Sequence, residues 1–217
     1  MKQLNIPFLK IPGSVAGSPE CSKFLDSLKR EKISEICWPV YGYKPEVAFA
    51  IAHNGEAIFL KYYVAEKETR TAFTEINDPV YRDSCVEFFV SLDNGLHYYN
   101  LEFNSKGVCL AQYGSGRQDR NLLPESVISE IEKSTRRTST GDGFYWELCL
   151  KIPQSVFCYD EPKNLTGKSV LGNFYKCGDD LEDPHFVVWN PISSEEPDFH
   201  LPEYFGRLSF ASAPVSP

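Results

Sequence analysis

Two glutamates, Glu87 and Glu102, are the residues whose type and spacing most directly suggest chemistry. They lie in the alternating stretches SCVEFFVSLD and HYYNLEFN, which flank a turn at residues 93–96. Antiparallel pairing around this turn sorts the apolar residues onto one face and places Glu87 opposite Glu102 on the other, beside Asn100. Carboxylates opposed in this way have Cβ atoms about 4.5 to 5.5 Å apart, which is unfavourable unless a cation, a shared proton or a ligand hydroxyl intervenes.

A sheet face that carries two carboxylates, an amide and aromatic side chains is suited to a sugar. Sugar hydroxyls donate to carboxylates and amides, whereas the CH faces of the ring pack on Tyr or Trp. The same residues also fit a solvated outer sheet face, on which Arg82 or Lys176 would neutralise the carboxylates. Spacing alone leaves both interpretations open.

The elements that would position this pair are mostly strands. EVAFAIAH and AIFLKYYVAE flank the hairpin turn Asn54-Gly55, and a further hairpin turns at residues 141–143 into FYWELCLKIP. SPECSKFLDSLKREKIS has apolar residues at helical spacing and predicts a helix over residues 19–31. We therefore predict an all-β fold: a jelly-roll-like antiparallel β-sandwich of about ten strands with one short N-terminal helix, in a single domain over residues 1–217.

Composition excludes several classes of protein. The 217 residues are 42% hydrophobic and 14% aromatic, which is far more buriable surface than a disordered chain has. The net charge of −8 repels nucleic acid and anionic lipid, so we expect neither as a partner. The apolar runs are much shorter than the roughly 20 residues of a bilayer-spanning helix.

Seven cysteines are present, and none form a CxxC motif, so we expect free thiols rather than a zinc site or a disulfide framework. The first residues, MKQLNIPFLKIPG, do not resemble a secretory signal. Both observations favour a cytoplasmic protein, unless a leader has been trimmed.

Several motifs, taken in order, resemble the family 9 carbohydrate-binding modules and their bacterial relatives. DPVYRDSCVEFFVSLD resembles the family's aromatic and acidic strand, and YYNLEFNSKG resembles the strand that follows. FYWELCLKIP resembles the Trp-x-x-Glu strand in part, since Glu147 follows Trp146 directly. The closing elements are similar to VLGNFYKCGDD, HFVVWNPI and FHLPEYFGRLSF, so the resemblance covers about residues 38–210.

The resemblance implies a sandwich that binds saccharides without cleaving them, in bacterial polysaccharide utilisation. The sugar would lie between two aromatic side chains, of which the first falls on Tyr81, with Glu87 as the acidic ligand. The basic ligand of some members has no clear counterpart, and Glu102 stands at the nearest cross-strand position. The second aromatic would come from the loop after the penultimate strand, which offers Trp189, Phe199 and His200.

The resemblance also allows calcium as a cofactor, because some members bind it. The candidate oxygen ligands form an acidic run: Asp179, Asp180, Glu182 and Asp183. This run lacks an EF-hand pattern, so a solvated acidic loop is the other interpretation. Saccharide identity, chain-end or internal binding, and oligomeric state are left open.

Two other functions fit parts of the sequence. Carboxyl groups about 5 to 5.5 Å apart occur in retaining glycosidases, so Glu87 and Glu102 are a candidate catalytic pair. Adjacent carboxylates on one hairpin approach a sugar from the same side, however, whereas acid and nucleophile must flank the scissile bond. A haem-binding sandwich of related topology would need an axial Met with His or Lys, and Met1 is the one methionine.

Overall fold

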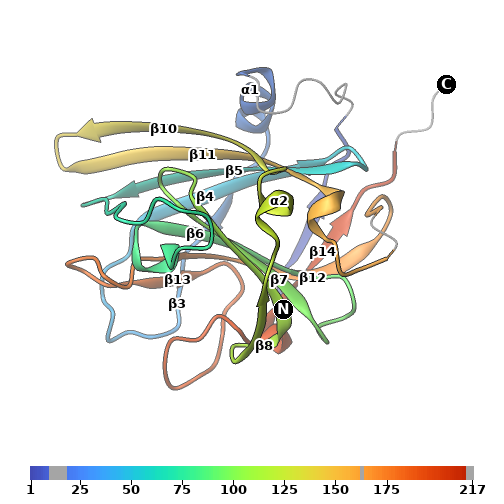
Figure 1. Ribbon diagram of the computed structural model, residues 1–217. Helices are drawn as coiled ribbons and strands as arrows, with labels where there is room; N and C mark the ends of the chain where they lie inside the picture. The colour runs from blue at the N-terminus through green and yellow to red at the C-terminus, as the bar shows by residue number, and fades with distance from the viewer. Residues whose placement is uncertain (10–18, 162–163, 214–217) are drawn as a thin grey trace.

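The computed structural model describes residues 1–9, 19–161 and 164–213, which form two β-sheets packed face to face (Figure 1). One sheet has nine strands and the other has five. This arrangement confirms the all-β sandwich. No helix in these residue ranges is long and apolar enough to cross a membrane.

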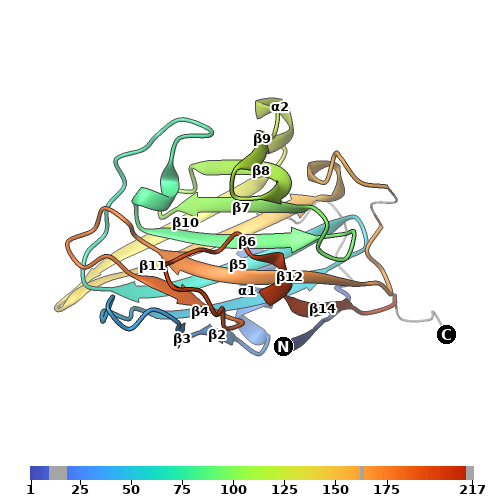
Figure 2. The same ribbon diagram turned by 90° about the horizontal axis from the view of Figure 1, so that it is seen from below.

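The larger sheet contains both strands of the carboxylate pair. Its main path runs β1-β14-β12-β6-β7-β8-β9, and β13 joins it by pairing with β12 and β3. Figure 2 shows β7, β6, β12 and β14 side by side in front of the smaller sheet. The strands are β1 (Gln3–Ile6), β3 (Glu35–Ile36), β6 (Cys85–Ser91), β7 (Tyr98–Asn104), β8 (Cys109–Gly116), β9 (Asp119–Leu122), β12 (Ser169–Cys177), β13 (Phe186–Val188) and β14 (Gly206–Phe210).

The smaller sheet has the order β10-β11-β5-β4-β2. Its strands are β2 (Glu31–Ile33), β4 (Glu46–His53), β5 (Ala57–Glu66), β10 (Glu132–Thr140) and β11 (Gly143–Pro153). The helical elements are α1 (Pro19–Ser27), α2 (Glu125–Ile128) and the 3-10 turns η2 (Val80–Arg82), η3 (Gln154–Val156) and η4 (Pro202–Tyr204). The two hairpins predicted for this sheet, β4-β5 and β10-β11, are both present.

The main core lies between the sheets, because the apolar face of each strand points toward the opposite sheet. On β6 and β7 the cross-strand pairs are Val86 with Phe103, Phe88 with Leu101, and Val90 with Tyr99, as the alternation predicts. All six residues are fully buried. A one-residue slip would turn this apolar set away from the core, so core burial holds the register that also pairs the two glutamates.

The structure differs from the sequence-based prediction at short elements. The described residues contain fourteen strands rather than about ten, because two- to four-residue strands such as β3, β13 and β9 are too short to show alternation. β1 pairs with β14 in parallel. Helix α1 ends at Ser27 instead of residue 31, since Glu31 pairs with Phe49 at the edge of the smaller sheet. A second helix, α2, was not predicted.

The outer face of the larger sheet is covered rather than bare. Strand residues Phe89, Tyr98 and Tyr175 pack there against loop residues, including Trp38, Phe199 and Phe205, in a second apolar cluster. This layer buries the polar side chains that β6 and β7 carry on that face. The solvated outer face is therefore wrong as an interpretation of the carboxylate pair.

Candidate functional site

The carboxylate pair lies beneath this outer layer. Glu87 on β6 is directly opposite Glu102 on β7, and the two residues are 2% and 3% exposed. Tyr175 of β12 is the neighbour of Glu87 on its other side, and Leu110 of β8 is the neighbour of Glu102. Two acids that repel each other in water are thus held together by the register that the apolar core imposes.

Two thiols are the donors that the structure gives to the Glu87 carboxyl group. The Cys177 Sγ atom lies 3.1 Å from Glu87 Oε1, and the Cys85 Sγ atom lies 4.0 Å from it. Burial, followed by the charge of Glu102, raises the pKa of Glu87 well above its usual value. Burial and the neighbouring acid therefore disfavour the charged form of this carboxyl group.

In the described part of the chain, Glu102 accepts a side-chain hydrogen bond through one carboxyl oxygen. Asn100 Nδ2 donates to Glu102 Oε1 at 2.7 Å, whereas the buried Glu102 Oε2 has no hydrogen-bond partner among the residues described. Burial raises the pKa of Glu102 to about 7, although the Asn100 hydrogen bond and Arg120 lower it. An unpaired buried oxygen is costly, so a hydroxyl group brought to this atom would be stabilised.

Asn100 itself is fully buried and does not line the cavity described below. Its Nδ2 also contacts Gln112 Oε1 on β8 at 3.2 Å. It donates hydrogen bonds to two polar side chains that do line the cavity, Glu102 and Gln112, and so helps to orient them.

Strand β9 supplies the positive charge for which the sequence showed no counterpart. The Arg120 guanidinium lies 4.2 Å from the centre of the Tyr98 ring and donates to Tyr98 O at 3.2 Å and to Asn100 Oδ1. Arg117, in the turn before β9, lines the cavity. Strand β9 has only four residues, so its sequence did not indicate that Arg120 would contact Asn100 or that the preceding turn would bring Arg117 to the cavity.

A cavity of about 460 Å³ contains both carboxylates in its lining. Five of the seven predicted site residues line it: Tyr81, Glu87, Glu102, Phe199 and His200. The lining also includes charged, amide and aromatic side chains that were not predicted as saccharide contacts: Tyr41, Gln112, Arg117, Asp179, Phe186, Glu196 and Asp198. This volume is within the range of small-molecule sites.

Three of the predicted residues give the cavity an aromatic wall. Tyr81, in η2, is 39% exposed and stands at the rim. Phe199 stacks on Tyr175 with ring centres 4.2 Å apart and an angle of 6° between the rings. His200 Nδ1 lies 3.0 Å from the Tyr98 hydroxyl. Burial, followed by Arg120 and Arg117, lowers the pKa of His200 to about 3, so this ring is neutral at ordinary pH.

Trp189 packs in the core and does not line the cavity. It is 2% exposed and packs edge to face on Phe174, with ring centres 5.7 Å apart. Gly206 lies so close that a Cβ atom there would be 2.4 Å from the indole. The sequence could not separate core from platform here, because strand β13 ends at Val188 and the direction of the next side chain depends on the path of the loop.

Neither basic residue proposed to neutralise the pair contacts it. Lys176 points to the opposite face of the sheet, where its Nζ lies 2.9 Å from Glu66 Oε2 between the two sheets. Arg82 forms an ion pair with Asp180 at 2.8 Å. Strand alternation explains the first case, because Lys176 and Glu87 sit at positions of opposite orientation.

The acidic run after β12 is divided among different partners. Asp180 pairs with Arg82, and Asp183 pairs with Lys67 at 3.0 Å. Asp179 lines the cavity, and burial, followed by the charge of Asp180, raises its pKa to about 6. The backbone N–H of Glu182 donates to Glu68. These contacts supply cations to two of the four carboxylates.

Comparisons with known proteins agree with this geometry. The model of carbohydrate-binding family 9 matches residues 21–210, beginning earlier than the motifs at residue 38. A candidate carbohydrate-binding protein from Bacteroides uniformis has a similar structure, with a TM-score of 0.88, 38% identity, and coverage of 96% of this chain and 99% of that one. The search of curated proteins found no match.

Two more distant structures share the fold. They are a family 9 carbohydrate-binding module from Caldicellulosiruptor kristjanssonii in complex with glucose and a module of the same family and organism in complex with cellotriose. Both are 12% identical to this chain, with TM-scores of 0.61 and 0.60. The match with the glucose complex covers 99% of this chain and 98% of the module's chain. The match with the cellotriose complex covers 100% of both chains. The protein therefore belongs to carbohydrate-binding family 9, and it binds carbohydrate without catalysing a reaction.

Proposed function

We propose that the 460 Å³ cavity is the saccharide site, with Glu87 and Glu102 as hydrogen-bonding groups at its floor and Tyr81 as a stacking surface at its rim. The observation that carries the proposal is the buried, partly unsatisfied carboxyl pair inside an aromatic cavity. Sugar hydroxyls can donate to both acids, and the CH face of a pyranose can pack on the exposed ring.

Phe199 and His200 are the proposed second aromatic surface. Both line the cavity, and both are held in place: Phe199 by its stack on Tyr175, and His200 by the hydrogen bond to Tyr98. Rigid aromatic walls lower the ordering cost that binding must overcome. Arg117, Gln112 and Asp198 supply polar contacts at the edges of the ligand.

Neutral glucans are the first ligand class to test, because the distant family members from Caldicellulosiruptor were solved with glucose and cellotriose. Negatively charged sugars are less suitable, since acidic side chains at the cavity (Glu87, Glu102, Asp179, Glu196 and Asp198) outnumber the arginine there. We expect modest affinity, because a small site leaves little free energy after ordering costs.

Isothermal titration calorimetry against glucose, cellotriose and a wider glycan panel tests the proposal. The double variant Tyr81→Ala/Glu87→Gln removes one platform and one carboxylate, and Tyr159→Ala is the control, since Tyr159 is 49% exposed and does not line the cavity. We expect the wild type and the control to bind the same saccharide and the double variant to lose binding. Retained binding in the double variant would place the site elsewhere, and no binding of any glycan would overturn the proposal.

A further inference from the structure

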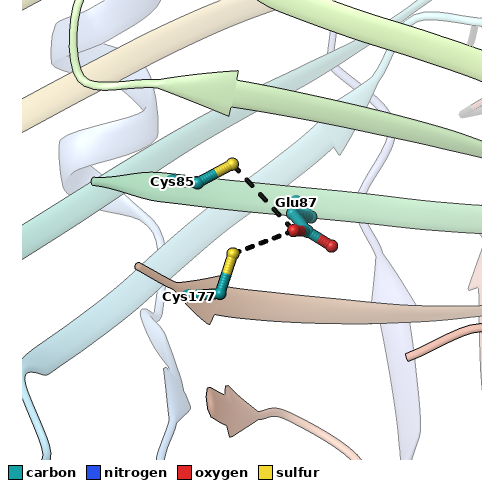
Figure 3. A group of neighbouring side chains, drawn as sticks. All are labelled: Cys85, Glu87 and Cys177. Atoms are coloured by element: carbon teal, nitrogen blue, oxygen red, sulfur yellow. Dashed lines mark hydrogen bonds between the residues drawn. The ribbon is translucent and has the colours of Figure 1, made fainter. Parts of the chain in front are cut away.

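A compact group of two cysteines and one glutamate lies at one end of the cavity floor. Cys85 and Glu87 are on the same face of β6, and Cys177 is on β12, directly opposite Cys85 (Figure 3). Figure 3 shows both sulfur atoms directed toward the Glu87 carboxyl group. One potential ligand atom from each residue, two thiol sulfurs and a carboxyl oxygen, lies within 4.8 Å of the other two. Among the described residues, no other group of three or more His, Cys, Asp or Glu side chains has this spacing.

The spacing fits a tetrahedral metal ion. The Glu87 Oε1 atom lies 3.1 Å from Cys177 Sγ and 4.0 Å from Cys85 Sγ. In a zinc site with Zn–S of about 2.3 Å and Zn–O of about 2.0 Å, tetrahedral angles place sulfur and oxygen ligands ~3.5 Å apart. The observed distances lie on either side of that value, so shifts of about 0.5 Å would complete the geometry.

The charges around the group also favour a cation. The thiols are the donors to the Glu87 carboxyl, and its other neighbours include the carboxyl of Glu102, which has an unpartnered buried oxygen. A bound cation would displace the protons of the two thiols and of the carboxyl group, which would be released to solvent.

The group is buried but reachable. Cys85 and Cys177 are 0% and 1% exposed, yet Cys177 and Glu87 both line the cavity. An ion could enter through the cavity, and its fourth coordination position would face the same space. Three protein ligands with one open position are sufficient to hold zinc.

We propose that Cys85, Glu87 and Cys177 form a binding site for a thiophilic divalent cation of the Zn²⁺ type. Two sulfur ligands select soft metals, whereas Ca²⁺ requires six to eight oxygen ligands. The site differs from the acidic run at residues 179–183 in both ligands and metal class. A metal bound to Glu87 would prevent this carboxyl group from binding a sugar hydroxyl, so metal binding would weaken saccharide binding. This effect on saccharide binding rests on the function proposed above.

Titration of the reduced, saccharide-free protein with Cd²⁺ tests the site directly, because Cd²⁺ bound to thiolate produces an ultraviolet charge-transfer band. We expect one equivalent of Cd²⁺ to produce the band, Zn²⁺ to remove it by competition, and excess Ca²⁺ to have no effect. Cys85→Ser and Cys177→Ser should each weaken binding about tenfold or more, as removal of a direct ligand predicts.

A second pair of thiols provides the matched control. Cys149 is hydrogen-bonded to Cys21 beneath α1, where the ammonium group of Lys61 also lies nearby. Cys149→Ser should leave the cadmium band unchanged. Glu87→Gln keeps both thiols and the shape of the site, so it should bind Cd²⁺ more weakly even if a serine variant fails to fold.

Absence of the band in fully reduced wild-type protein would overturn the proposal, as would a band that depends on Cys149 and not on Cys177. Calorimetry with a saccharide, with and without one equivalent of Zn²⁺, then tests the competition. Metal binding without any saccharide binding would refute the function proposed above and leave the metal site intact. Saccharide binding without metal binding would refute the metal site and leave the proposed function intact.

Discussion

Glu87 and Glu102 face each other across β6 and β7 while only 2% and 3% exposed, and the hydrogen bonds to their carboxyl groups come from thiols and an amide. The pair exists because the apolar residues on the other face of the same hairpin must meet the core. The polar arrangement on one face is thus a consequence of packing on the other, and it leaves the buried Glu102 Oε2 without a hydrogen-bond partner among the described residues.

Tyr81→Ala should reduce saccharide affinity about tenfold, which corresponds to about 1.4 kcal/mol. Tyr81 is 39% exposed at the cavity rim, so its removal takes away a stacking surface without opening the core. Calorimetry gives the affinity and a thermal melt gives the stability, which should be nearly unchanged. Tyr159→Ala is the control, and equal losses in both variants would show that the effect is not local.

Glu87→Gln should also weaken saccharide binding about tenfold, or about 1.4 kcal/mol, because the amide replaces a carboxyl oxygen by an NH2 group that cannot accept a hydrogen bond from a sugar hydroxyl. The melting temperature should stay the same or rise, since the change removes repulsion with Glu102. Glu203→Gln, at an exposed position outside the cavity lining, is the matched control. A fall in stability parallel to the fall in affinity would mean that Glu87 is structural.

Trp189→Ala should lower the stability of the fold and leave saccharide affinity unchanged, the opposite of the effects expected for Tyr81→Ala and Glu87→Gln. Trp189 is 2% exposed and packed on Phe174 and Gly206, so truncation should lower the free energy of unfolding by about 3 to 5 kcal/mol. Denaturant unfolding measures this loss. At temperatures where the variant remains folded, its saccharide affinity should match that of the wild type. A loss of affinity in the folded variant would indicate that Trp189 is part of the saccharide site.

Asp26→Asn should destabilise the protein by about 1 kcal/mol at neutral pH, a small value because Asp26 is partly exposed. Its carboxylate lies 2.8 Å from the buried Lys61 ammonium and accepts a hydrogen bond from the Tyr63 hydroxyl. Burial would raise the pKa of Asp26, but the hydrogen bonds from Lys61 and Tyr63 outweigh it and hold the pKa below 3.8.

A pH series distinguishes this ion pair from a simple packing effect. A depressed carboxyl pKa stabilises the fold above the unfolded value and loses that contribution as pH falls through the folded value. The difference in stability between wild type and Asp26→Asn should therefore be complete above about pH 5 and disappear in strong acid. Asp142→Asn, at an exposed turn, should show no such dependence.

The hairpins were predictable because their information is local. Alternation along β6 and β7, together with the four-residue turn, leaves one register that buries Val86, Phe88 and Val90, and this register also pairs Glu87 with Glu102. Helix α1 was located by its apolar stripe, but its end was not, because β2 forms only through pairing with β4. Short edge strands escape prediction for the same reason.

The sequence by itself determined the sandwich, the carboxylate pair and the aromatic residue at the rim, because period-two patterning and motif order are properties of neighbouring residues. Only the tertiary structure decided that the outer face is covered, that Trp189 lies in the core, that Arg117 reaches the cavity and that Cys177 lies beside Glu87. Each of these depends on the path of a loop or on contacts between strands far apart in the chain. Such contacts form where packing lowers the free energy of the whole molecule, and no local pattern records them.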